Sequence, residues 1–178
     1  YTMMDKYLLT VTMRADGSAK FAKGNRWGYF PSAAVAWRIM DEDFMEGSRD
    51  WLSNLKLRLS YGTAGNNRIG SGLMYTTYSM AAATSKGPYF DEKFNSMLEH
   101  GSTLSNPGLK WETTITRNLG FDFGFLNNRI SGSIDAYWNS TKDLLMKTEI
   151  PSNTGYSYQY QNFGKTSNKG VELQMNAI

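Results

Sequence analysis

The chain has 178 residues, is rich in aromatic residues (14%) and glycine (17 residues), and carries a formal net charge of +3. It contains no cysteine and one histidine, His100, which excludes disulfides, thiol catalysis and a multi-histidine metal site. The mean hydropathy is −0.49, and no run approaches the roughly 18 apolar residues of a membrane-spanning helix. The positive charges are dispersed, unlike the dense basic stripe of nucleic-acid-binding proteins.

Six segments alternate apolar and polar residues with a period of two, which predicts β-strands that each have one apolar face. In chain order these segments are 6–14, 32–39, 55–61, 118–125, 130–139 and 171–177. The only helical structure is predicted near residues 41–50. There the acidic residues 41–43 suit a solvated turn or the first turn of a short helix. The chain is therefore predicted to be all-β.

The connections between these strands differ greatly in length. Asn127–Asn128 forms a tight hairpin between two strands, because asparagine tolerates the positive φ that such a turn demands. Segments 14–27, 62–111 and 146–164 are much longer and fall on the other side of the predicted sheet. Long loops on one side and short turns on the other are typical of an antiparallel transmembrane β-barrel segment with long extracellular loops.

Aromatic residues occur near the ends of the strands, with the same parity as the apolar face. The outer ends, next to the long loops, carry Trp27, Tyr29, Tyr61, Trp111 and Trp138, and the inner ends carry Tyr7, Trp37 and Phe125. In a bilayer-spanning barrel such residues form two membrane-interface girdles. The alternative is a soluble β-sandwich carbohydrate-binding module, in which the same residues would cap a core between two sheets.

The opposite faces of the strands carry small, amide and acidic residues, among them Gly120, Asp122 and Asp135. Such residues suit the wall of a water-filled or plugged lumen. Six strands do not close a barrel, because the smallest single-chain barrels have about eight and free strand edges are costly in hydrocarbon. We therefore expect residues 1–178 to be an internal piece of a larger barrel.

Several blocks of the sequence carry a family resemblance. The longer blocks are FAKGNRWGYFPS at 21–32, LKLRLSYGTAGN at 55–66, NPGLKWE at 106–112 and GKTSNKGVEL at 164–173, and the shorter ones are 6–9, 14–18, 36–39, 125–129 and 143–145. Together they resemble the SusC/RagA family of TonB-dependent outer-membrane transporters of Bacteroidetes. The resemblance covers most of the chain except about 69–105.

The resemblance implies that residues 1–178 are a partial receptor barrel domain, from the C-terminal half of a barrel of about 22 strands. The plug domain and the N-terminal barrel strands are expected to be absent. The implied function is import of oligosaccharides or peptides across the outer membrane. The implied partners are outer-membrane lipid, a SusD-like surface lipoprotein, the TonB complex acting through the absent plug, and a glycan or peptide substrate. No nucleic acid, cofactor or metal is implied.

Candidate substrate-binding residues are aromatic residues on the predicted extracellular loops, because aromatic rings stack on sugar faces. They are Tyr89, Phe90, Tyr156, Tyr158 and Tyr160. The same rings could instead pack loops together or against a partner lipoprotein. No catalytic residue is predicted, since Asp122 and Asp135 suit the lumen wall and nothing indicates the carboxylate pair of a glycosidase. No sequence motif indicates an enzymatic function.

Overall fold

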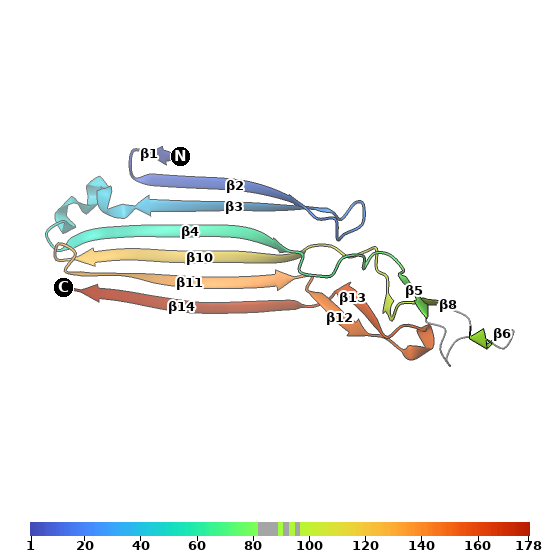
Figure 1. The fold of residues 1–178 in the computed structure, drawn as a ribbon. Helices are drawn as coiled ribbons and strands as arrows, with labels where there is room; N and C mark the ends of the chain where they lie inside the picture. Colours follow the sequence, from blue (N-terminus) through green and yellow to red (C-terminus); the bar gives the residue numbers. More distant parts are fainter. Residues whose placement is uncertain (82–88, 91–92, 95–96) are drawn as a thin grey trace.

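The structure is a computed structural model that describes residues 1–81, 89–90, 93–94 and 97–178, with side chains described for 1–80 and 99–178. Its main feature is one antiparallel sheet of seven strands in the order β1-β2-β3-β4-β10-β11-β14 (Figure 1). Over the described ranges, no helix is long and apolar enough to cross a bilayer. The chain is nearly all-β, as predicted.

The strands of the main sheet confirm the six predicted ones and add a short strand at the N-terminus. They are β1 (Thr2–Met3), β2 (Tyr7–Gly17), β3 (Trp27–Arg38), β4 (Leu52–Asn66), β10 (Glu112–Phe125), β11 (Ile130–Lys142) and β14 (Lys165–Ala177). The predicted helical segment forms two short 3₁₀ helices, η1 (Ile39–Asp41) and η2 (Asp43–Ser48), between β3 and β4.

The two ends of the sheet differ, as the connection lengths predict. Both termini, η1, η2 and the β10–β11 hairpin lie at one end, which we call the short-turn end (Figure 1). Residues Leu126, Asn127 and Asn128 of the hairpin have φ values of 52°, 57° and 60°, so the asparagine pair adopts the positive φ that was predicted. The opposite end, the long-loop end, carries the connections β2–β3, β4–β10 and β11–β14.

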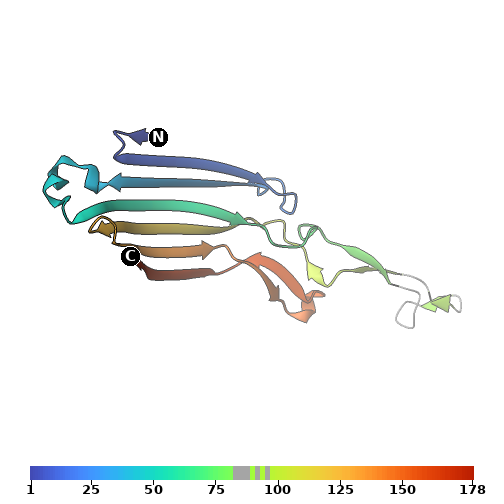
Figure 2. The same ribbon diagram turned by 60° about the vertical axis from the view of Figure 1, so that its left-hand side comes forward.

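Short strands occupy the two longest connections at the long-loop end (Figure 2). The β4–β10 connection contains β5 (Tyr78–Ala81), β6 (Tyr89–Phe90), β7 (Lys93–Phe94), β8 (Met97–His100) and β9 (Thr103–Leu104), and the β11–β14 connection contains β12 (Leu145–Glu149), η3 (Ser152–Thr154) and β13 (Tyr158–Asn162). Strand β13 pairs with β12 and also, in parallel, with β9. The two connections therefore share one small sheet.

The most deeply buried hydrophobic cluster lies among the loops rather than beneath the main sheet. Phe21, Ile69 and Leu109, from the β2–β3 and β4–β10 connections, form this loop core. Phe21 and Leu109 are fully buried, and Leu145 and Tyr160 of the β11–β14 connection pack against the cluster. All three long connections therefore contribute to a single apolar cluster, which holds the loops together.

Candidate functional site

The cross-strand register divides the main sheet into an apolar face and a polar face. One row of residues in register shows the apolar face clearly: Tyr7, Trp37, Leu57, Phe121, Ile134 and Leu173. Phe121 is 40% exposed and Leu173 is 63% exposed. A soluble sandwich would bury this face against a second sheet. In the described part of the chain no such sheet covers it, so the face is open (Figure 2).

An ion-pair network crosses three strands of the polar face. Arg58 on β4 donates to Asp122 on β10, with its Nη2 and Nε at 2.7 Å and 3.0 Å from Oδ1. The same Nη2 donates to Oδ2 of Asp135 on β11 at 3.1 Å. Hydrogen bonds between ionised groups are stronger than neutral ones, so the network ties β4, β10 and β11 together. As predicted, both carboxylates lie on the polar face.

A glycine makes this network possible. Gly120 stands in register between Arg58 and Asp135. A Cβ atom on Gly120 would lie 2.5 Å from Oδ1 of Asp135 and 2.8 Å from Cζ of Arg58. The guanidinium therefore crosses the sheet directly over the glycine backbone, and any larger residue at this position would have to displace it.

Toward the long-loop end, the polar face of β10 and β11 is rich in hydroxyl and amide groups. Thr114 and Thr141 hydrogen bond across β10 and β11, with their Oγ1 atoms 2.9 Å apart. The Tyr137 side chain lies over Gly170, where a Cβ atom would be 2.6 Å from the tyrosine hydroxyl. Tyr137 is an aromatic residue at a polar position of its strand. It fits there because its cross-strand partner, Gly170, is a glycine and leaves room for the ring.

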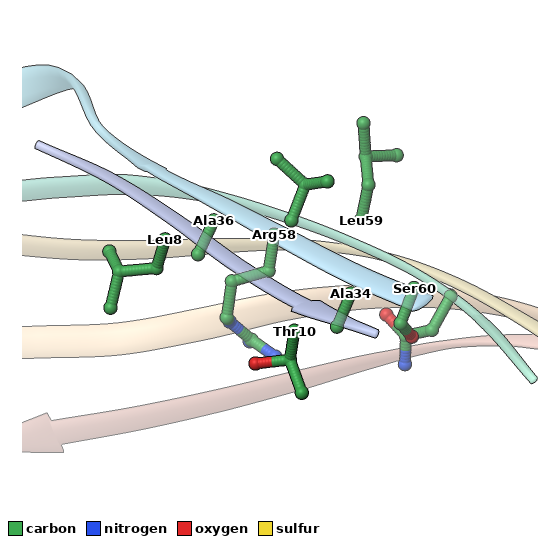
Figure 3. Close-up of a pocket in the computed structure, with 9 residues that line it drawn as sticks. Leu8, Thr10, Ala34, Ala36, Arg58, Leu59 and Ser60 are labelled. Atoms are coloured by element: carbon green, nitrogen blue, oxygen red, sulfur yellow. The ribbon is translucent and has the colours of Figure 1, made fainter. Parts of the chain in front are cut away.

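A shallow hollow lies on the same face near β2, β3 and β4 (Figure 3). Its lining includes the small side chains of Ala34 and Ala36, and the register places Ala36 between Leu8 and Arg58. Leu8 is an apolar residue at a polar position of its strand. The hollow shows that the polar face includes an apolar patch of small residues next to the charged network.

The structure places the predicted girdle aromatics in two different settings. Those on the open apolar face are exposed or half-exposed: Trp27, Tyr29, Tyr61 and Trp138 near the long-loop end, and Tyr7 and Trp37 near the short-turn end. Trp111 instead packs against Phe21 and Phe30, with ring centroids 5.5 Å away in both cases, and its indole N–H donates to the carbonyl of Arg26. Trp111 therefore connects the loop core to the sheet.

Aromatic rings also stack in pairs at the short-turn end. Phe125, at the end of β10, stacks on Trp51 with centroids 6.0 Å apart, and Tyr7 stacks on Trp37 at 6.4 Å. Trp51 was not among the predicted girdle residues, because it falls in the connection before β4 rather than within an alternating segment. Both pairs lie where the strands meet the short connections.

Glu42 accepts hydrogen bonds from three side chains at the short-turn end. The hydroxyl of Tyr7 and the indole N–H of Trp37 donate to its Oε1 at 2.6 Å and 2.9 Å, and Lys6 donates to its Oε2 at 3.2 Å. The Glu42 side chain is only 14% exposed. The acidic residues 41–43 were predicted to form a solvated turn or the first turn of a short helix. Glu42 instead links the segment between η1 and η2 to β2 and β3 through its hydrogen bonds.

This network predicts a pH-dependent stability at the short-turn end. The bonds from Tyr7, then those from Trp37 and Lys6, lower the pKa of Glu42 below its usual value. A carboxylate whose pKa is lower in the folded than in the unfolded state stabilises the fold at pH values above the unfolded pKa, about 4.3 for glutamate. This stabilisation is lost as the pH falls through the folded-state pKa. In denaturant titrations of the full-length protein, Glu42→Gln should therefore be less stable than wild type at neutral pH.

The difference between Glu42→Gln and wild type should shrink as the pH falls below about 4. Glu46→Gln, an exposed position on η2, is the matched control and should leave the pH profile unchanged. A stability difference between Glu42→Gln and wild type that stayed constant at low pH would show that the carboxylate charge is not what matters.

The candidate substrate-binding aromatics take different positions in the loops. Tyr156 packs against the ring of His100 with centroids 4.5 Å apart, and the ammonium of Lys147 lies 3.7 Å from the ring centroid of Tyr158. Tyr160 packs against the loop core. Tyr89–Phe90 form β6, but their side chains lie outside the described residues. The three described tyrosines come from one connection and are half-buried.

The part of the chain with described side chains shows no group of three or more histidine, aspartate or glutamate residues that could hold a metal ion. Asp122 and Asp135 of the polar face are both paired with Arg58. This arrangement links strands and does not set two carboxylates apart for acid–base chemistry.

Comparison with known families identifies the class of protein to which this sheet, with one apolar and one polar face, belongs. Residues 1–177 match the family model described as TonB dependent receptor-like, beta-barrel. The chain belongs to this family of TonB-dependent receptor β-barrels. The family consists of receptors and transporters rather than enzymes.

Relatives place the chain in the SusC/RagA group, which confirms the resemblance. It is 42% identical to the TonB-dependent receptor SusC of Bacteroides thetaiotaomicron over 99% of this chain and 17% of SusC. It is 37% identical to the TonB-dependent receptor P26 of Formosa agariphila over 99% of this chain and 17% of that protein. The RagAB peptide importer in the closed-closed state superposes with a TM-score of 0.81 and 32% identity, over 96% of this chain and 18% of that chain.

The chain spans less than one fifth of the length of these relatives. The two edges of the main sheet are β1–β2 on one side and β14 on the other. The predicted fold class, an antiparallel barrel segment with long loops at one end, is thus confirmed.

Proposed function

We propose that this protein is an outer-membrane TonB-dependent transporter that imports oligosaccharides or peptides, with residues 1–178 contributing barrel wall and outer loops. The observation that carries the proposal is the single-layered sheet with one open apolar face and one polar face. Lipid would cover the apolar face, while the polar face would line the lumen. The similarity to a solved peptide importer supports peptides as one substrate class, and the similarity to the TonB-dependent receptor SusC supports the role of a receptor of this family.

The spacing of the aromatics fits a bilayer. On β10 and β11, Trp138 pairs with Arg117 and Phe125 pairs with Ile130, so the two rows are eight residues apart. This spacing is about 26 Å along a strand, or about 20 Å along the normal for a typical barrel tilt, close to the usual apolar band. Tyr29 and Trp37 on β3 are also eight residues apart. We infer that the girdle residues mark the two membrane interfaces and that the long loops are extracellular.

The outer loops would contact the substrate and a partner. Tyr156, Tyr158 and Tyr160 supply aromatic rings next to a loop core that fixes their positions, and we propose that they contact the glycan or peptide. A SusD-like surface lipoprotein would cover the same loops. The TonB complex would act through a plug domain, and the polar face of the described sheet would form part of the wall around it.

The proposal is tested by uptake in cells. A strain that lacks the gene is complemented with the full-length protein, and entry of fluorescent oligosaccharides and peptides is measured with and without an active TonB complex. We expect that the complemented strain takes up one of the two substrate classes and that loss of TonB abolishes this uptake. Equal uptake by the deletion strain, or uptake that does not need TonB, would refute the proposal.

A further inference from the structure

Four cationic side chains lie together on the apolar face at the long-loop end. They are Arg117 on β10, Lys142 on β11, and Lys165 and Lys169 on β14, which we call the cation cluster. The register places Arg117 and Lys169 on either side of Trp138, and it places Lys142 directly opposite Lys165. Because side chains alternate between faces, all four share the face of Trp138, away from the polar face.

No counter-charge balances the cluster in the part of the chain that the structure describes. None of its four members forms an ion pair there, and the acidic neighbour of Lys142, Asp143, pairs with Lys110 at 3.0 Å. The other residues of this face between the cations are Thr113, Ile115, Ser140 and Ser167. Thr113, Ser140 and Ser167 offer hydroxyl donors, and none of the four residues has a carboxylate.

Two lysines directly opposite each other on antiparallel strands repel and destabilise the pair. Lys142 and Lys165 stand in this relation, and both are exposed. Arg117 is half-buried, and its guanidinium lies 5.8 Å from the ring centroid of Tyr61. An arrangement of like charges on a face without acids is favourable when an external anion binds between them.

The position of the cation cluster relative to the membrane interface indicates which anion it binds. Lys169 and Arg117 are level with Trp138, whereas Lys142 and Lys165 lie four residues further toward the loops, about 13 Å along the strands. If Trp138 marks the outer interface, as the proposed function has it, the cations span the headgroup layer and the region just above it. A lysine on the lipid-facing side is well tolerated at that depth.

We propose that the cation cluster binds phosphate groups of the phosphorylated glycolipid that forms the outer leaflet. Arginine binds phosphate oxygens through its planar fork of donors, and lysine acts as a point charge. The threonine and serine hydroxyls of the same face can donate to further oxygens of the lipid sugar. The site faces the membrane, so it is separate from the lumen and from the loops proposed to contact substrate.

The test uses full-length protein that has been stripped of lipid and kept in detergent. Lipopolysaccharide is titrated into this protein, and binding is measured by native mass spectrometry. Lys142→Gln/Lys165→Gln should weaken binding by about 30-fold, at the usual contribution of a lysine near an anionic membrane surface. The matched control, Lys23→Gln/Arg68→Gln, removes two exposed cations from the outer loops and should bind like wild type. Lys142→Arg/Lys165→Arg keeps the charge and should retain binding.

Two further ligands define the source of the phosphate. Lipopolysaccharide treated with phosphatase should bind weakly to the wild type, as weakly as untreated lipopolysaccharide binds to Lys142→Gln/Lys165→Gln. Inorganic phosphate should not compete with lipopolysaccharide for the wild type. Equal binding by the glutamine variant and the control, or full binding of the dephosphorylated lipid, would overturn the proposal. Competition by inorganic phosphate would assign the site to the free ion and overturn the lipid assignment. The titration needs no transport, so its failure and a failure of uptake are separate results.

Discussion

Replacing Phe21 by alanine is expected to destabilise the outer loops by about 3–5 kcal/mol, the cost of removing a phenylalanine from a packed core. Phe21 is fully buried and contacts Trp111, and its cluster receives residues from all three long connections. Hydrogen exchange of the full-length protein measures the effect. Amides of β9, β12 and β13 should exchange about 100-fold faster or more, because 1.4 kcal/mol corresponds to a factor of ten.

The control for this experiment is Phe163→Ala. Phe163 lies in the same region but is 66% exposed, so its loss should change exchange very little. Amides of β10 and β11 in the main sheet should keep their protection in both variants, because the loop core lies outside the sheet. If the main sheet lost protection together with the loops, the loop core would not be a separate unit of stability.

Phe121→Arg is expected to hinder membrane insertion of the full-length protein. Phe121 lies on the apolar face halfway between Arg117 and Phe125 on β10, which places it near the midplane under the proposed orientation. A charge at that depth on the lipid face costs about 2–4 kcal/mol. The measurement is the amount of heat-modifiable, folded protein recovered in outer-membrane fractions.

The matched control is Gln174→Arg. Gln174 lies on β14 in register with Ser133, on the polar face, so its replacement places the same charge where the lumen would be. We expect near-normal assembly of Gln174→Arg and reduced assembly of Phe121→Arg. Normal assembly of both would mean that lipid does not contact the apolar face, and it would refute the proposed placement in the membrane.

The sequence pattern predicted the strands but not their full length. All six predicted strands form, and each of them extends by three or more residues beyond the prediction at the long-loop end. The cause is visible in β10 and β14. Thr113, Thr114 and Thr116 place hydroxyls on both faces, and Lys165–Lys169 include polar residues on both faces, so the alternation of a half-buried strand is lost. These ends need no apolar face if they extend beyond the bilayer.

The side-chain networks were harder to predict, because each depends on register across a long connection. The diagonal positions of Asp122 and Asp135 on neighbouring strands follow from the hairpin between β10 and β11. Their partner Arg58 is brought to them only by the pairing of β4 with β10, after a connection of residues 67–111. The same reason applies to the loop core, where Phe21 and Leu109 are far apart in the chain and no periodic pattern marks either of them.

The parallel pairing of β9 with β13 has a consequence for biogenesis. Residues 103–104 pair with residues 158–159, and strands β10 and β11 lie between them in the sequence. Closing such a non-local contact is slow relative to hairpin formation. We therefore expect the cell-surface portion of the protein to mature last, after the neighbouring wall has been assembled, so that a stalled intermediate would expose unstructured loops to extracellular proteases.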